Sequence, residues 1–383
     1  MLALKSLVSM TQIFHIYPGL LPTALLSFFG AFLVSILLSV ARIQTNRLGA
    51  DLWSPQSSHV RPAQRLGGIG IVSGLALALL ILSWSKAERL TYEYYLISLM
   101  PLFVISFVGD LGRELQPWLR LFAIALSGGL VIYFFDMRLV SIDLKLIDMA
   151  LAVVSISVVT TIFAAMGVTN SFNIIDGLNG LAGGFSLLCS FALAIVSVKV
   201  ELYGVGAALT VLASAIFGFL LINFPNGRLF LGDTGAYVLG HTLVWIAIGI
   251  NFRAPEISAF AILLVFFWPV AETALSIFRR LRRNKKVSHP DHLHFHQLVM
   301  RSIEIQYLGR SRRNLSNPIA TLFVLAFASA PMGAGVLFLE NDAAAKIVVI
   351  IFSLLFVFGY YGLLIFCRRH RRRLNTLKVS KSF

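Results

Sequence analysis

The hydropathy pattern divides the chain into eleven long apolar stretches that are separated by shorter polar connections. Each stretch is long enough to cross a hydrocarbon layer of about 30 Å as a helix. The pattern therefore predicts an all-α polytopic membrane protein, organised as a single integral-membrane domain over residues 1–383. The expected spans are Tyr17–Val40, Gly68–Trp84, Tyr92–Val108, Pro117–Phe135, Leu151–Met166, Leu181–Val198, Tyr203–Ile222, Thr234–Asn251, Ile257–Phe278, Pro318–Leu339 and Ala344–Cys367.

The composition agrees with a membrane protein. Hydrophobic residues make up 58% of the 383 residues and charged residues 13%, too few to cover a soluble protein of this length. The two cysteines, Cys189 and Cys367, lie in or at the end of apolar stretches, which excludes a disulfide framework and disfavours structural zinc. The first apolar stretch is not followed by a convincing signal-peptide cleavage site, so we expect it to be a retained span.

The basic residues are distributed unevenly between the two predicted faces. The connections on the C-terminal side hold 24 of the 32 lysines and arginines, so we expect this side to be cytoplasmic and the N-terminus to lie outside. The predicted cytoplasmic loops are 41–67, 109–116, 167–180, 223–233 and 279–317, followed by a basic tail over 368–383. This bias explains the net charge of +15 without a nucleic-acid partner, which is the weaker alternative.

The densest polar motif lies in the third of these loops, over Asn170–Gly184. Asn170, Asn173 and Asp176 recur at intervals of three residues, so they share a face if the segment is helical. Carboxamide and carboxylate oxygens suit Mg²⁺ in a phosphate site, and the nearby glycines allow close backbone approach. The alternative is a turn rich in glycine and asparagine.

The other predicted cytoplasmic loops carry further polar motifs on the same face. Asp233 opens the eighth span, where a helix N-cap alone would explain it, but a second hard carboxylate beside Asp176 supports a magnesium pocket. Asp110 ends the third span and is open to three interpretations: a metal ligand, a base or an interface cap. The fork of Arg65 suits phosphate oxygens, although ordinary positive-inside charge explains it better when it is taken alone, and Arg120 lies at the opening of the fourth span.

The loop before the tenth span contains four of the eight histidines within His289–His296. A zinc site is one interpretation, but no cysteine or nearby glutamate completes a zincin-type motif. The basic run Arg279–Lys286 precedes these histidines, so His294 and His296 fit a clamp for a diphosphate better.

Taken together, these loops resemble the polyprenyl-phosphate N-acetylhexosamine-1-phosphate transferases of glycosyltransferase family 4. The specific strings are Asn-x-x-Asn-x-x-Asp-Gly-x-Asn-Gly-Leu from Asn170 and Gly-Asp-x-Gly from Gly232. The resemblance implies transfer of N-acetylhexosamine-1-phosphate, most of all N-acetylglucosamine-1-phosphate, from a UDP-sugar to undecaprenyl phosphate, with release of UMP. It further implies initiation of lipid-linked O-antigen or another surface polysaccharide, a bacterial inner-membrane location, a homodimer as one option, and Mg²⁺ with Mn²⁺ as a substitute.

The resemblance also implies roles for individual residues. The lipid phosphate would attack the β-phosphorus of the UDP-sugar, and Asp110 would orient or deprotonate that lipid phosphate. The implied catalytic residues are Asp110, Asp176 and Asp233, and the implied metal ligands are Asn173 and Asp233. The implied substrate-binding residues are Arg65, Arg120, Asn170, Asn179, His294 and His296.

Several positions depart from the family pattern. Gly109 stands where the first of two adjacent aspartates is usual, His292 replaces an arginine, Gln297 replaces a third histidine, and Ala236 replaces a frequent serine. The missing run of three histidines favours N-acetylglucosamine over the muramoyl-pentapeptide substrate, while N-acetylfucosamine and N-acetylquinovosamine stay open.

A transporter or flippase for lipid-linked sugars is the alternative from a different class. The span centres are almost uncharged, with Glu272 the main exception, and no paired broken helices are evident. The sequence therefore favours the transferase.

Overall fold

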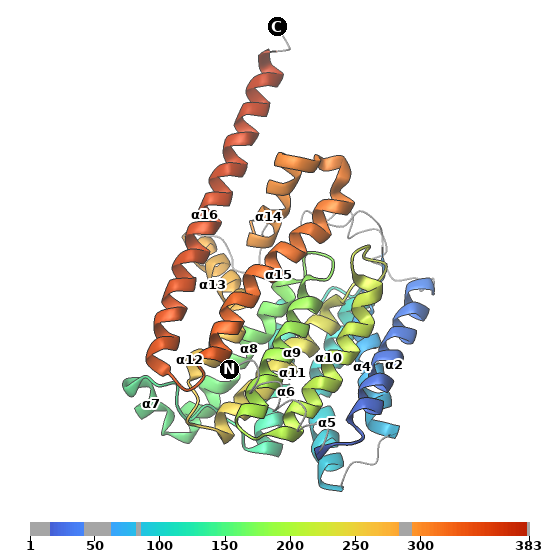
Figure 1. Cartoon of the computed structure of the whole chain (residues 1–383), viewed down its shortest axis with the longest axis vertical. Helices are drawn as coiled ribbons and strands as arrows, with labels where there is room; N and C mark the ends of the chain where they lie inside the picture. Colours follow the sequence, from blue (N-terminus) through green and yellow to red (C-terminus); the bar gives the residue numbers. More distant parts are fainter. Residues whose placement is uncertain (1–15, 42–62, 82–85, 283–292, 381–383) are drawn as a thin grey trace.

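The computed structural model describes residues 16–41, 63–81, 86–282 and 293–380. Within these ranges every regular element is a helix, apart from one isolated parallel bridge between Gln64 and Leu229. Figure 1 shows most of the long helices running side by side, with the end of α16 projecting from one end of the bundle. The predicted all-α polytopic class is confirmed.

Each of the eleven predicted spans corresponds to a helix or to a pair of helices. Among the described residues nine helices are long and apolar enough to cross a membrane, while α4 is a shorter apolar helix. The elements are α2 (Leu20–Val40), α4 (Gly67–Ile81), α5 (Lys86–Asp110), α6 (Pro117–Phe135), α7 (Lys145–Leu151), α8 (Val154–Ile175), α9 (Leu181–Lys199), α10 (Tyr203–Asn223), α11 (Gly232–Arg253), α12 (Ala259–Val265), α13 (Phe267–Leu281), α14 (Phe295–Ile303), η1 (Glu304–Leu308), η2 (Arg310–Arg312), α15 (Arg313–Leu337) and α16 (Asp342–Ser380).

The ninth predicted span is not one straight helix. It consists of α12 and α13, which meet at an angle of 84°. Pro269 has no N–H to donate to the carbonyl of Val265, which is the last residue of α12, and it is tolerated in the first turn of α13. The prediction of a continuous Ile257–Phe278 span was therefore wrong at this point, and the bend fixes the direction in which Glu272 leaves α13.

Three predicted loops contain more helix than expected. α8 continues to Ile175, so most of the predicted loop 167–180 is helical and carries Asn170 and Asn173 on its last two turns. The predicted loop 279–317 contains α14, η1, η2 and the first turn of α15, and the tail continues as helix to Ser380. Hydropathy misses the last turns of α8 because the polar side chain of Asn173 there contacts protein instead of lipid.

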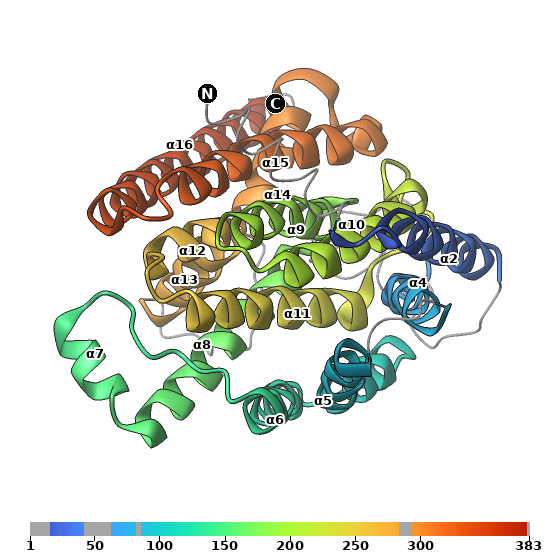
Figure 2. The same cartoon turned by 60° about the horizontal axis from the view of Figure 1, so that its bottom comes forward.

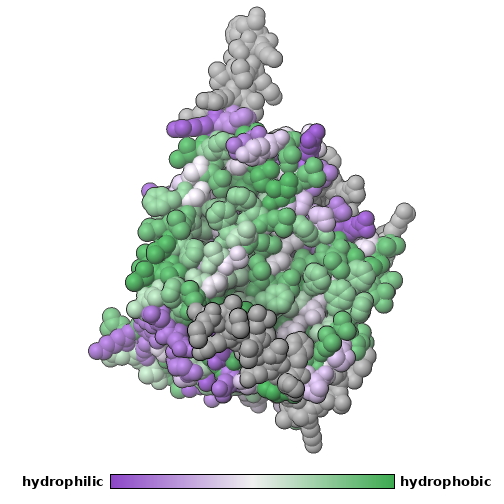
Figure 3. Space-filling view, in the orientation of Figure 1, coloured by the Kyte–Doolittle hydropathy of each residue, from purple (hydrophilic) through white to green (hydrophobic). Residues whose placement is uncertain are grey.

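The core lies around α9, α10 and α11, which are the most buried spans. Figure 2 shows these three helices between α15 and α16 on one side and α5 and α6 on the other. The outer helices α2 and α16 expose many leucine, isoleucine and phenylalanine side chains, and the surface in Figure 3 is mainly hydrophobic between its two ends. The protein is therefore built to be surrounded by lipid along its middle.

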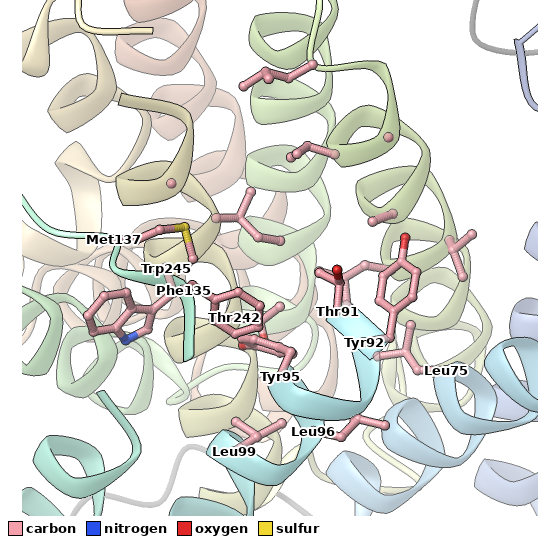
Figure 4. Close-up of a pocket in the computed structure, with 18 of the residues that line it drawn as sticks. Leu75, Thr91, Tyr92, Tyr95, Leu96, Leu99, Phe135, Met137, Thr242 and Trp245 are labelled. Atoms are coloured by element: carbon pink, nitrogen blue, oxygen red, sulfur yellow. The ribbon is translucent and has the colours of Figure 1, made fainter. Parts of the chain in front are cut away.

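A largely apolar cavity of about 580 Å³ lies among α4, α5, α10 and α11. Figure 4 shows Tyr95 and Thr242 on its wall, where the Tyr95 hydroxyl bonds Thr242 Oγ1 at 3.0 Å. The cavity occupies the halves of α5 and α11 that lie away from Asp110 and Asp233. It is therefore separate from the polar cluster at the other ends of these helices.

Candidate active site

Asp233 is the centre of a buried polar cluster. It lies in the first turn of α11 and is only 4% exposed. Arg65 Nη2 lies 3.1 Å from its Oδ1, and Arg120 Nη2 lies 3.0 Å from its Oδ2. Asn173 Nδ2, from the last turns of α8, donates to Oδ1 at 3.0 Å. One carboxylate thus brings together the segment before α4, the start of α6 and the end of α8.

Backbone pairing explains why Arg65 reaches this carboxylate. The segment before α4 runs beside the segment before α11: Phe230 N–H donates to Gln64 O at 2.8 Å, and Gly67 N–H donates to Phe230 O at 2.9 Å. Gly232 has φ +78°, and a Cβ there would lie 2.2 Å from Arg65 O. Glycine is therefore required where the two segments cross and α11 begins.

Asp110 has a capping role. Its Oδ1 accepts the backbone N–H of Asp233 and its Oδ2 accepts that of Thr234, each at 2.8 Å. The residue is 2% exposed, and Arg65 Nε lies 4.0 Å from Oδ1. This geometry favours the interface-cap interpretation, because both oxygens are already engaged at the start of α11. A direct role on the lipid phosphate stays a prediction.

Gly109 lies beside the same ion pairs. A Cβ at this position would be 3.7 Å from Arg120 Nη2 and 3.8 Å from Asp233 Oδ2. The departure from the family pattern is therefore located within the polar cluster. Because residue 109 is glycine, it offers Arg120 no carboxylate, and Arg120 pairs with Asp233.

Asp176 adjoins the cluster from the end of α8, where it is the C-cap residue. Within the described part of the chain its carboxylate makes no ion pair or side-chain hydrogen bond. Loss of hydration raises the pKa of Asp176 to about 7; Arg65 and His296 oppose the rise, while the charges of Asp233 and Asp110 add to it. Asp176 is therefore a carboxyl group that can change its charge near neutral pH.

The other two asparagines of the motif have different surroundings. Asn170 lies one turn before Asn173 on α8 and is half-buried. Asn179 holds its own turn in place: its Nδ2 donates to Pro225 O at 2.9 Å, and its N–H donates to Asn317 Oδ1 at 2.9 Å. These contacts give Asn179 a structural role, and substrate binding by Asn170 or Asn179 stays a prediction.

The two predicted histidines lie at the start of α14, and both are buried. Burial lowers the pKa of His294 to about 3 against the opposing effect of Glu272, so His294 is neutral at pH 7. A Cβ on Gly177 would lie 2.4 Å from His296 Nε2, which places the histidines against the turn that follows Asp176. His292 lies outside the described residues.

Sequence reasoning gave no role to Glu272, although it noted the unusual charge in an apolar span. Its Oε1 accepts the N–H of Phe295 at 2.6 Å and lies 3.0 Å from His296 Nδ1. A single carboxylate in a membrane helix was the available signal, since such a residue is costly unless it has partners. Its partners lie 23 and 24 residues later in the chain, and no local pattern indicates them.

Residues 92–251, from α5 to α11, match glycosyl transferase family 4. This segment is similar to that family. The matched segment contains Asp110, Arg120, Asn173, Asp176 and Asp233, which are the residues of the polar cluster apart from Arg65. The match supports the family expected from the sequence.

Among the relatives of this chain is a probable undecaprenyl-phosphate N-acetylglucosaminyl 1-phosphate transferase from Bacillus subtilis, 26% identical over 70% of the chain and 76% of the relative. The decaprenyl-phosphate N-acetylglucosaminephosphotransferase of Mycobacterium leprae is 26% identical over 77% and 78%. The undecaprenyl-phosphate alpha-N-acetylglucosaminyl 1-phosphate transferase of Yersinia pestis is 25% identical over 62% and 65%.

The polar cluster has the chemistry of an anion-binding centre. Two guanidinium groups, of Arg65 and Arg120, meet at a buried carboxylate, and phosphate oxygens would find charge-assisted donors there. Asp233 and Asn173 offer hard oxygen atoms at adjacent positions, which fits Mg²⁺ if phosphate oxygens and water complete its coordination. Among the described residues no group of three or more histidine, cysteine or acidic side chains is placed to hold a metal ion.

Proposed function

We propose that this chain transfers N-acetylglucosamine-1-phosphate from UDP-N-acetylglucosamine to a polyprenyl phosphate such as undecaprenyl phosphate, with release of UMP. The observation that carries the proposal is the Asp233 carboxylate held between Arg65 and Arg120 at the start of α11. The printed names of the relatives support it, because they combine polyprenyl phosphate with N-acetylglucosamine phosphate transfer.

In this reaction an oxygen of the lipid phosphate attacks the β-phosphorus of the UDP-sugar. A P–O bond forms to the lipid phosphate, the bond to the bridging oxygen breaks, and UMP leaves with that oxygen. Catalysis then depends mainly on positioning and on neutralising negative charge. Arg65 and Arg120 would donate to phosphate oxygens, and Asp110 would keep the first turn of α11 in place under Asp233.

Mg²⁺ belongs to the proposal, with Mn²⁺ as a substitute. Asn173 and Asp233 would hold the ion, and its chemistry when bound is to offset the charge of the diphosphate. Asp233 is paired with two arginines, so we expect these guanidinium groups to turn towards phosphate oxygens in the substrate complex.

The topology and pathway also belong to the proposal. The excess of basic residues on the C-terminal side supports a cytoplasmic active site and C-terminus, with the N-terminus outside the inner membrane. A cytoplasmic site can take UDP-sugars directly from solution. The lipid-linked product would then begin O-antigen or another surface polysaccharide, and a homodimer is one arrangement of the enzyme.

The sugar is tested by UMP release from a panel of substrates. Purified chain in detergent, with undecaprenyl phosphate and Mg²⁺, should release UMP with UDP-N-acetylglucosamine faster than with UDP-N-acetylfucosamine, UDP-N-acetylquinovosamine or UDP-muramoyl-pentapeptide. An Asp233→Ala variant of intact fold is the control for contaminating activity. Preference for another sugar would overturn the sugar assignment, and release from none of them would overturn the reaction.

A further inference from the structure

Glu272 lies on the second half of the broken ninth span, behind the histidines and away from the Asp233 cluster. We propose that Glu272 is a positioning residue for the transfer reaction: it fixes the imidazole of His296 against the Asp176–Gly177 turn and so sets the position of that turn. This inference rests on the proposed function for its kinetic consequences. Its structural part, the orientation of the His296 ring, does not depend on the reaction.

The contacts of Glu272 with α14 are short and buried. Its Oε1 accepts the N–H of Phe295, the first residue of α14, at 2.6 Å and lies 3.0 Å from His296 Nδ1. His294 Nδ1 is 3.6 Å from the same oxygen. Glu272 is 2% exposed and His296 1% exposed, so water does not compete for these contacts. A buried carboxylate at a helix N-terminus is stabilised by such N–H groups.

The opposite edge of the His296 ring meets the active-site turn. A Cβ on Gly177 would lie 2.4 Å from Nε2 and 3.1 Å from Cδ2, so the ring lies directly against the backbone that follows Asp176. The ring of His294 stacks on that of His296, with centroids 5.5 Å apart and planes 11° apart. The imidazole is thus held on three sides: by Glu272, by His294 and by the turn.

Aromatic packing holds the start of α14, which carries His294 and His296, next to Glu272 on α13. The ring of Phe295 lies 4.9 Å from Trp268 of α13 and 4.9 Å from Phe356 of α16, measured between centroids. Phe295 therefore anchors the start of α14 to α13, while its neighbour His296 faces Glu272. Because α13 leaves α12 at 84°, this assembly connects a membrane helix to the active-site turn.

The chemistry of the pair determines the orientation of the ring. An ionised carboxylate only accepts hydrogen bonds, so Nδ1 of His296 must carry the proton and Nε2 faces the turn. The contacts of Nε2 then depend on whether Glu272 keeps the ring in place. Replacement of Glu272 by glutamine keeps the shape and an acceptor for Phe295, but it removes the charge that selects this tautomer.

The kinetic test is a double-mutant cycle of Glu272→Gln and His296→Asn. We expect each single variant to lower kcat/KM for UDP-N-acetylglucosamine about 10- to 100-fold, the range seen for partners that orient a functional histidine, with KM for undecaprenyl phosphate unchanged. The double variant should be no worse than His296→Asn alone. Additive losses, or an equal rise in both KM values, would show that Glu272 does not act through His296.

Glu304→Gln is the matched control for loss of a buried glutamate. Glu304 is 5% exposed and pairs with Arg313 at 2.9 Å, outside the polar cluster. It should leave the KM for UDP-N-acetylglucosamine and the coupling to His296 unaffected. A loss in Glu304→Gln equal to that in Glu272→Gln would assign both effects to general destabilisation and overturn the proposal.

The structural test uses ¹⁵N-histidine NMR of the full-length protein, with the His296 signals identified by their loss in His296→Asn. The wild type should show protonated Nδ1 hydrogen-bonded to a carboxylate, and Glu272→Gln should shift this signal. A wild-type signal with the proton on Nε2 alone would overturn the proposal even if Glu272→Gln did not fold. If the protein releases no UMP from any UDP-sugar, this measurement still decides the orientation of His296.

Discussion

Asp110 accepts the backbone N–H of Asp233 on its Oδ1 at 2.8 Å. Its Oδ2 accepts the neighbouring N–H of Thr234 at the same distance. The last residue of α5 thus caps the first turn of α11, and the residue it holds is the one that carries the ion pairs with Arg65 and Arg120. The two carboxylates therefore have different tasks in the structure, since Asp110 fixes the backbone of Asp233.

Replacing Asp110 should reveal this cap. Loss of an N-terminal cap costs about 0.5–2 kcal/mol, so Asp110→Ala should lower the thermal midpoint in detergent. Asp110→Asn keeps one acceptor oxygen and should lie between the wild type and Asp110→Ala in both thermal midpoint and rate of UMP release. An Asp110→Asn protein with wild-type stability but no activity would instead indicate a direct role on the lipid phosphate.

Replacing Asp176 should change how stability depends on pH. Its folded pKa of about 7 lies above the ordinary value of 3.8, so the folded state binds the extra proton between these values. The contribution of Asp176 to stability is therefore fully present below about pH 4 and is lost as the pH rises to 7. Asp176→Asn should be more stable than the wild type at pH 8, by at most about 4 kcal/mol since partial exposure reduces the effect, and equal to it near pH 4.

Thermal unfolding at pH 8 and pH 4 in metal-free detergent buffer measures this difference. Asp148→Asn is a control carboxylate outside the cluster, on α7. Equal stability of Asp176→Asn and the wild type at pH 8 would show that Asp176 is well hydrated in the folded protein.

Gly177→Ala should disturb the histidine and the turn together. The new Cβ would lie 2.4 Å from His296 Nε2, closer than side chains approach, so either the ring or the turn must move. We expect a loss of UMP release in Gly177→Ala. In a His296→Ala background, Gly177→Ala should cause no further loss of UMP release, because the space left by the imidazole accommodates the new methyl group.

Gly167→Ala is the matched control on α8, where a Cβ meets no atom within 4 Å. It should behave as the wild type in activity and thermal midpoint. Full activity in Gly177→Ala would show that the turn and His296 have room to separate, contrary to the packing described above.

The sequence predicted where the spans lie because burial in lipid requires long apolar stretches, and all eleven stretches are helical. It did not predict that α8 continues past Met166, because Asn170 and Asn173 interrupt the apolar pattern. The bend before Pro269 was also missed. The missing N–H of a proline was visible in the sequence, but hydropathy alone does not register it.

Part of the site was predictable from the order of the spans. Alternation of helix direction placed Asp110, Asn173 and Asp233 on one face, and in the structure both Asp110 and Asn173 contact Asp233. The role of each residue within the cluster depends on the positions of individual atoms, which the sequence does not give. Which carboxylate caps α11 and which pairs with Arg120 follows from backbone geometry at Gly232, and the partnership of Glu272 with His296 requires the fold of α13 onto α14.

The most direct test of the account is transfer of radiolabelled sugar phosphate in detergent, without an intact bilayer. Purified wild-type chain, given UDP-N-acetylglucosamine labelled in the sugar, undecaprenyl phosphate and Mg²⁺, should move label into the organic phase with equimolar release of UMP. Asp233→Asn, with an unchanged elution volume and circular dichroism, should lower the rate by about 10²- to 10³-fold, as loss of a central electrostatic group does. Absence of transfer by the wild type, or transfer by Asp233→Asn at the wild-type rate, would contradict the account.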